Sequence, residues 1–133
     1  MSDERSDPGV GPFAELLGAR RAHMGEGRCR FELMAESRHF NPHGSVHGGV
    51  VYSLVDYAMG GALTSRLAPG ERCATLEIKI NYLAAAGAGP LFAEAKVADR
   101  TSRIGVLEAR VTDGRGRLIA LATGSFYIHG PRS

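Results

Sequence analysis

The chain has 133 residues, of which 44% are hydrophobic and 23% are charged, and its formal net charge at pH 7 is +2. This length predicts one domain with a single core. The small net charge gives no support to nucleic acid or an anionic membrane as a partner, and no apolar stretch reaches the roughly 20 residues that a membrane span needs.

The N-terminal stretch MSDERSDPGVGP is polar and acidic, without the charged and apolar regions of a signal peptide. Cys29 and Cys73 are far apart in the sequence and form no C-x-x-C motif. Two scattered thiols of this kind are typical of reduced, buried cysteines in a cytosolic protein. We therefore expect a cytoplasmic location.

The first part of the chain contains three segments of different character. Residues 1–11 are rich in Ser, Asp, Pro and Gly, so we expect a disordered arm that precedes one domain over 12–133. The apolar spacing in PFAELLGARRAHM, residues 12–24, predicts a short amphipathic helix. The alternation in GRCRFELMAE, residues 27–36, predicts a half-buried strand with Cys29 on its inner face.

The middle of the chain combines a loop with a long helix. We expect a loop over 38–47 because Asn41-Pro42 and His43-Gly44 break regular structure. From Gly49 to about Leu67 the sequence is apolar over most of a helical wheel, which is typical of a buried helix. Its polar and small residues fall on one stripe at 100° per residue: Ser53, Asp56, Gly60 and Thr64.

The second half of the chain reads as four antiparallel strands. The segment CATLEIKINYL alternates between two faces of a strand. One face carries Ala74, Leu76, Ile78, Ile80 and Tyr82, and the other carries Thr75, Glu77, Lys79 and Asn81. Further strands are expected near 90–99, 103–112 and 117–128, and Asp113-Gly114 predicts a tight hairpin between the last two. One long helix needs a broad sheet to cover it, which predicts an α+β fold. The last strand is apolar on both faces, which indicates a partner chain and hence a homodimer.

Three histidines, His39, His43 and His47, are spaced by four residues. On a helix this spacing would align three imidazoles as metal ligands. Pro42 and Gly44 disfavour a helix there, and no Cys or carboxylate cluster supplies a fourth ligand. Surface loop histidines are therefore the better interpretation, and we expect no metal site.

The start of the long helix is a candidate binding site. The first N–H groups of a helix have no partner within the helix and lie at the positive end of its dipole. Since Gly48 and Gly49 have no Cβ, a ligand carbonyl could approach the backbone there, as an oxyanion site requires. The alternative is that these glycines only permit a tight turn or close packing.

Asp56 is the second candidate. A carboxylate two turns into an apolar helix costs free energy unless it is hydrogen-bonded or used. A salt bridge or a solvated gap would explain it structurally. The adjacent Ser53, Gly60 and Thr64 favour a cleft at a subunit interface, where a carboxylate acts as nucleophile or as general base for water.

Together these residues resemble a known family. The run Asn41-Pro42, Gly44, His47-Gly48-Gly49, Leu54, Asp56 is similar to the motif of hotdog-fold acyl-CoA thioesterases of the phenylacetate-degradation (PaaI-like) type. The segment TLEIKINYL and the final hairpin also resemble that family. The resemblance implies a long central helix wrapped by an antiparallel sheet, with a short N-terminal helix. It also implies a homodimer in which the two sheets join edge to edge, or a homotetramer made of two such dimers. The active sites would lie at the interface between subunits.

The resemblance also implies roles for individual residues. The Gly48 N–H would polarise the thioester carbonyl, and Asp56 of the partner subunit would be nucleophile or base. Asn41 and His47 would hold the leaving group, the water or the loop geometry. Thr75 occupies the position of a hydroxyl residue near the attacking water. From the helix start and the polar stripe themselves we also expect substrate contacts with three residues: Gly49, Ser53 and Gly60.

A thioester suits these residues because its carbonyl is activated and a thiolate leaves well. We therefore expect no metal and no cofactor, since coenzyme A is part of the substrate. Arg100 and Arg103 flank the turn DRTSR and are candidates for binding the CoA phosphates. A solvated turn is the alternative explanation of these two arginines.

Two other functions remain open at this point. A hotdog hydratase or dehydratase would need a His–Asp or His–Glu pair for proton transfer, and His47 with Asp56 could be read that way. A non-catalytic acyl-CoA-binding module would have no need of the Asp56 carboxylate. The combined pattern favours the thioesterase.

Overall fold

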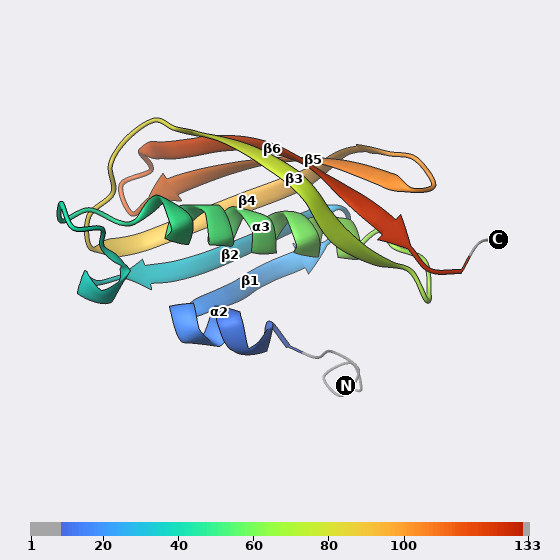
Figure 1. The fold of residues 1–133 in the computed structure, drawn as a ribbon, viewed down its shortest axis with the longest axis horizontal. Coiled ribbons are helices and arrows are strands. Elements are labelled where there is room, and N and C mark those ends of the chain that lie inside the picture. The colour runs from blue at the N-terminus through green and yellow to red at the C-terminus, as the bar shows by residue number, and fades with distance from the viewer. Residues whose placement is uncertain (1–8, 132–133) are drawn as a thin grey trace.

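The computed structural model describes residues 9–131, and the arm expected over 1–11 lies largely outside them. These residues form two short helical segments, one long helix and six antiparallel strands, which follow the order β1-β2-β4-β5-β6-β3 across the sheet. Figure 1 shows the helix α3 (Gly48–Thr64) lying along the concave side of the curved sheet. The expected α+β hotdog architecture, a long helix wrapped by an antiparallel sheet, is confirmed.

The elements before α3 differ in part from the expectation. The helix α2 (Gly11–Leu17) is short, and the strand β1 (Ala19–Gly25) follows it directly. The prediction of a helix over 12–24 is therefore wrong for its second half. Gly18 has a φ of 81°, a left-handed conformation that ends a helix, and the segment after it pairs with β2 (Arg28–Ala35).

The strand β2 has the burial that its alternation predicts. Cys29, Phe31, Leu33 and Ala35 are buried, while the residues between them are more exposed. Burial raises the pKa of the Cys29 thiol to about 11. Cys29 is therefore an apolar core residue at neutral pH, as expected, whereas Cys73 is only half-buried.

The buried helix is confirmed and ends at Thr64 rather than near Leu67. Its apolar side packs on the inner face of the sheet, with eight buried side chains: Val50, Val51, Leu54, Val55, Ala58, Met59, Ala62 and Leu63. The sheet meets them with apolar residues of β2 and of β4 (Gly89–Arg100), β5 (Ile104–Asp113) and β6 (Leu118–His129). Removal of this apolar surface from water stabilises the fold.

The strand β3 (Arg72–Tyr82) forms one edge of the sheet, and within the described residues it pairs only with β6. A bulge between Thr75 and Glu77 adds one residue to β3 and reverses the sides of the strand beyond it. Thr75 pairs with Phe126, and Ile78 pairs with Gly124, so both face α3. The expectation that Thr75 and Ile78 lie on opposite faces is therefore wrong.

The loop between β2 and α3 contains a buried histidine. His39 ends the short 3-10 helix η1 (Ser37–His39) and is 4% exposed. Its Nδ1 accepts the Glu36 N–H at 3.0 Å, and its Nε2 lies 2.7 Å from the Leu17 oxygen, as a donor. The interpretation as a surface histidine is wrong for His39, which instead ties the loop to the end of α2.

Among residues 9–131 no helix is long and apolar enough to span a membrane. Within the same residues no group of three or more His, Cys, Asp or Glu side chains is placed to hold a metal ion.

Candidate active site

The start of α3 is capped by a histidine side chain. His47 is the N-cap residue, and its Nδ1 accepts the Gly49 N–H at 2.8 Å. This bond leaves the proton of the neutral ring on Nε2. The His47 oxygen accepts the Val50 N–H at 2.9 Å. Among the alternatives for His47, the geometry therefore supports a role in holding the loop and the helix start.

The Gly48 N–H is the free donor at this helix start. No acceptor among residues 9–131 takes it, whereas the N–H groups of Gly49 and Val50 are both used. An ideal Cβ at Gly48 would lie 3.2 Å from the ring of Tyr82, whose hydroxyl donates to the Gly48 oxygen at 2.8 Å. The contact with Tyr82 supports the packing reading of this glycine. Its N–H lies at the positive end of the helix dipole, and its role as an oxyanion donor stays a prediction.

Asn41 organises the loop that leads to this helix. Its Oδ1 accepts the N–H groups of His43 at 2.8 Å and of Ser45 at 3.2 Å. Its Nδ2 donates to the Ser45 hydroxyl at 3.2 Å. Both ends of the amide are thus used within the loop, as in an Asx turn, so the structure places Asn41 in loop geometry.

Asp56 and Thr75 meet across the gap between α3 and β3. The Thr75 hydroxyl donates to Asp56 Oδ1 at 2.7 Å. Asp56 is half-buried, and Thr75 is exposed at the sheet edge. One carboxylate oxygen is therefore oriented by Thr75, and the lone pairs of the other remain available for a water or a substrate. The sequence prediction placed both residues near the reacting water, and the structure brings them together.

A cleft of about 390 Å³ opens beside this pair. The helix side of the cleft contains Asp56, Tyr57, Gly60 and Thr64, and the facing walls include aromatic and thiol side chains: Phe31, Cys73 and Phe126. The rings of Phe31 and Tyr57 are stacked with centroids 5.3 Å apart. A largely apolar cleft with a few polar groups is the usual form of a small-molecule site.

Ser53 was expected on the same stripe but does not line this cleft. Its hydroxyl donates to the Gly49 oxygen one turn earlier in α3, at 2.8 Å. Serine in a helix commonly makes this bond to its own backbone. Gly49 itself is packed under the His47 ring, where an added Cβ would lie 3.0 Å from Nδ1. The substrate contacts expected of Ser53 and Gly49 stay predictions.

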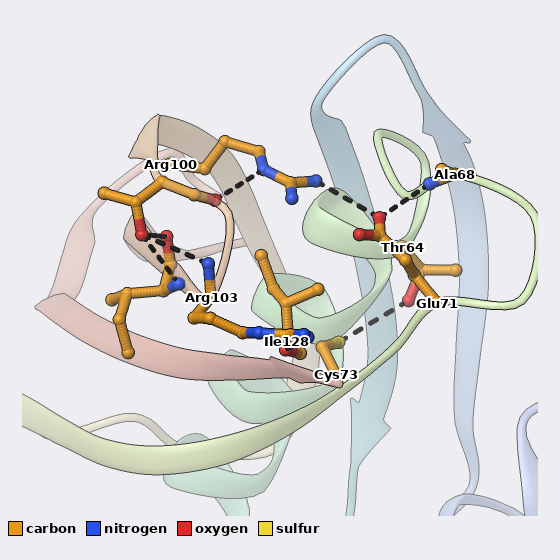
Figure 2. A network of polar contacts seen from close by, with 9 residues as sticks. Thr64, Ala68, Glu71, Cys73, Arg100, Arg103 and Ile128 are labelled. Atoms are coloured by element: carbon orange, nitrogen blue, oxygen red, sulfur yellow. Dashed lines mark hydrogen bonds and ion pairs between the residues drawn. The ribbon is translucent and has the colours of Figure 1, made fainter. Parts of the chain in front are cut away.

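The two arginines that were expected to bind phosphate lie at the other end of α3. Figure 2 shows Arg100 next to Glu71, with the Arg100 Nη1 3.5 Å from the Glu71 Oε1. The Ala68 N–H and the Arg100 guanidinium hold the pKa of the Glu71 carboxyl below its ordinary value. Arg103 donates to the Ile128 oxygen at 3.1 Å. Both guanidinium groups border a cleft of about 500 Å³ that also contains Ser102.

Several residues of this site escape sequence reasoning. Tyr82 closes over Gly48 only because the β3 bulge returns its side chain to the helix side. The stacked rings of Phe31 and Tyr57 lie far apart in the sequence and look like ordinary core residues. The alternating pattern of β2 places Phe31 inside, but nothing in that pattern indicates a cleft.

Comparisons with known proteins agree on one family. The profile of the thioesterase superfamily matches residues 43–120, which include the α3 start, Asp56 and Thr75. A protein of Archaeoglobus fulgidus with a provisional esterase name is 35% identical over 114 residues, which cover 85% of this chain and 72% of that protein. The 1,4-dihydroxy-2-naphthoyl-CoA hydrolase of Listeria monocytogenes is 27% identical over 81% of this chain and 88% of its own length.

Solved structures share the fold over nearly the whole chain. The PaaI protein of the Escherichia coli phenylacetic acid degradation operon superposes with a TM-score of 0.83 at 26% identity, covering 97% of this chain and 89% of that one. A structure of the PaaI protein of Thermus thermophilus gives 0.81 at 29% identity, covering 88% and 98%.

Proposed function

The chain belongs to the thioesterase superfamily, and on that premise we propose that it hydrolyses a CoA thioester of an organic acid to the free acid and CoA. The observation that carries the proposal is the Thr75-bound carboxylate of Asp56 at the mouth of an apolar cleft. The proposed reaction needs no cofactor, because coenzyme A is part of the substrate. The unpaired state of both cysteines agrees with the cytoplasmic location that we propose.

In the proposed mechanism the Gly48 N–H donates to the thioester oxygen as negative charge develops there. The Asp56 carboxylate supplies the electron pair, either by removing a proton from the attacking water or by attacking the carbonyl carbon itself. On the general-base route the water oxygen bonds to the acyl carbon, the C–S bond breaks, and the CoA thiolate takes up the proton that Asp56 removed. On the nucleophilic route an anhydride between the acyl group and Asp56 forms as the C–S bond breaks. Water then hydrolyses this anhydride, which frees the acid and the Asp56 carboxylate, and the thiolate takes up a proton from that water. The same two groups serve both routes.

A hydratase mechanism finds less support at this site. Such a mechanism would need the His47 ring and the Asp56 carboxylate as a proton-transfer pair. The His47 Nδ1 is occupied by the Gly49 N–H, and the neighbour of Asp56 is the Thr75 hydroxyl.

We propose that the complete site uses two copies of the chain. Gly48 and Asp56 are eight residues apart on one helix, so about 12 Å of helix axis separates them. One chain therefore cannot place both groups on a single carbonyl. The edge strand β3 is 11 residues long and pairs on one side only, and long unpaired edges readily add a strand from another chain. A homodimer joined at β3 would bring the Asp56 of one copy toward the Gly48 of the other.

Arg100 and Arg103 remain our candidates for the CoA phosphates. Their cleft lies beside the C-terminal end of α3. A phosphate would compete with Glu71 for Arg100, because arginine makes charge-assisted hydrogen bonds with both groups.

Thr75→Val tests the positioning of the carboxylate. Losing a hydrogen bond to a charged group corresponds to about 1.5–3 kcal/mol, so we expect kcat to fall about 10- to 100-fold with little change in KM. Thr75→Ser keeps the hydroxyl and should retain most of the activity. Steady-state kinetics on both variants measures this, and equal losses in Val and Ser variants would contradict the role.

Thiol release from a panel of short, long and aryl acyl-CoAs tests the function itself. We expect turnover of at least one thioester by the purified protein without added metal. Binding of these compounds without hydrolysis of any of them would replace the proposal with a non-catalytic acyl-CoA-binding protein.

A further inference from the structure

Two neighbouring glycines in the middle of α3 have different surroundings. An ideal Cβ at Gly61 would lie 2.5 Å from the Cys29 Sγ and 3.2 Å from the Cys29 Cβ. Gly61 therefore allows the helix to pack directly on β2. An ideal Cβ at Gly60 would meet one atom within 4 Å, the Cε2 of Phe126, at an ordinary contact distance of 3.8 Å. Packing thus explains Gly61 but leaves Gly60 unexplained.

The free space at Gly60 belongs to the cleft beside Asp56. Gly60 follows Asp56 by four residues and so lies one helical turn further along the same face. An acyl group whose carbonyl is held at Asp56 would therefore extend over Gly60. The helix backbone itself forms the wall at this point, because no side chain stands there.

The remaining lining of the cleft contains Arg21 and Met24 together with aromatic side chains that suit a flat, apolar acyl group. Tyr57 and Phe31, which both line the cleft, are stacked with ring centroids 5.3 Å apart, and Tyr57 is also stacked with Phe13 outside the lining, at 6.4 Å. Phe126 lies opposite Gly60. Aromatic walls of this kind offer stacking and edge contacts to a ring. The cleft volume of about 390 Å³ lies within the range of small-molecule sites.

Cys73 completes this end of the cleft as an unreactive group. Its Sγ lies 3.8 Å from the Thr64 hydroxyl oxygen and 4.0 Å from the Gly60 oxygen. Burial raises the pKa of the Cys73 thiol above its ordinary value. The neutral thiol is a poor nucleophile, so Cys73 contributes an apolar surface and does not compete with Asp56 for the thioester.

We propose that Gly60 sets the depth of the acyl end of the cleft and thereby determines that ring-bearing acyl groups are accepted. This inference rests on the proposed thioesterase function and adds the residue that selects the acyl group. A methyl group at position 60 would fill the space over the helix turn, where a ring would lie but a short straight chain would not reach.

The test compares phenylacetyl-CoA with butyryl-CoA in wild type and Gly60→Ala. One methylene in an apolar pocket changes kcat/KM by about 10- to 200-fold, so we expect a loss of at least about tenfold for phenylacetyl-CoA and little change for butyryl-CoA. Alanine is the better helix former, and its Cβ has room, so the variant should fold. Gly60→Val should increase the discrimination further.

Gly87→Ala is the matched control, because an added Cβ there meets nothing within 4 Å and Gly87 is not among the residues that line the cleft. It should leave both substrates unchanged. If wild type hydrolyses both thioesters and Gly60→Ala changes them equally or not at all, Gly60 has no part in selection and the proposed function stands. If wild type hydrolyses no thioester, the proposed function and this inference are both lost.

Discussion

Asp56→Asn is expected to lower kcat for thioester hydrolysis by about 10²- to 10⁴-fold, the usual contribution of a positioned general base. Asparagine has nearly the same shape, and its Oδ1 can still accept the Thr75 hydroxyl that now bonds Asp56 at 2.7 Å. It has no negative charge and cannot take a proton from water. The fold should therefore survive while the chemistry is lost.

The control for this substitution is Asp99→Asn. Asp99 is exposed at the end of β4, and its Oδ1 accepts the Arg100 N–H at 2.8 Å, a bond that asparagine also makes. We expect normal turnover there and unchanged thermal unfolding in both variants. Near-normal kcat in Asp56→Asn would remove Asp56 from the reaction and leave the cleft without its proposed base.

Gly48→Pro is expected to lower kcat by about 10²- to 10³-fold, because proline lacks the N–H that would stabilise the oxyanion. Proline is well tolerated at the first position of a helix. The preceding residue must be extended, and His47 already has φ −63° and ψ 137°. The substitution thus removes one donor and preserves the helix start.

Gly48→Ala separates the donor from the space that a side chain takes up. Its Cβ would lie 3.2 Å from the Tyr82 ring, so it adds nearly the same crowding but keeps the N–H. We expect the alanine variant to be clearly more active than the proline variant when kcat is compared at saturating substrate. Equal activities would mean that Gly48 matters only for packing against Tyr82.

The sequence predicts local features of this fold well where one periodicity dominates. The alternation from Cys29 to Ala35 and the apolar stretch of α3 each correspond to the observed element. The end of α2 is harder to predict, because residues 19–24 carry no strong strand pattern and a single glycine such as Gly18 does not by itself fix a helix end. Single-chain pattern reasoning cannot detect that β1 gains its stability by pairing with β2.

The candidate site shows the same division. Gly48 and Asp56 could be proposed from the sequence, because the start of a helix and a single carboxylate in an apolar helix are both visible within one segment. Their contacts with Thr75 and Tyr82 could not be predicted in this way. Both side chains reach α3 because of a bulge in β3, which the sequence pattern does not reveal. The cleft likewise depends on rings from several elements, which only the folded chain brings together.

The most direct test of a site shared between two copies combines the two substitutions. Asp56→Asn and Gly48→Pro chains are coexpressed with different affinity tags, the mixed dimers are isolated by both tags in turn, and thiol release is measured. Each mixed dimer has one site with both substitutions and one with neither, so we expect about half of the wild-type activity per dimer, from two chains that are inactive alone. Mixed dimers as inactive as either parent would contradict a site built from Gly48 of one copy and Asp56 of the other.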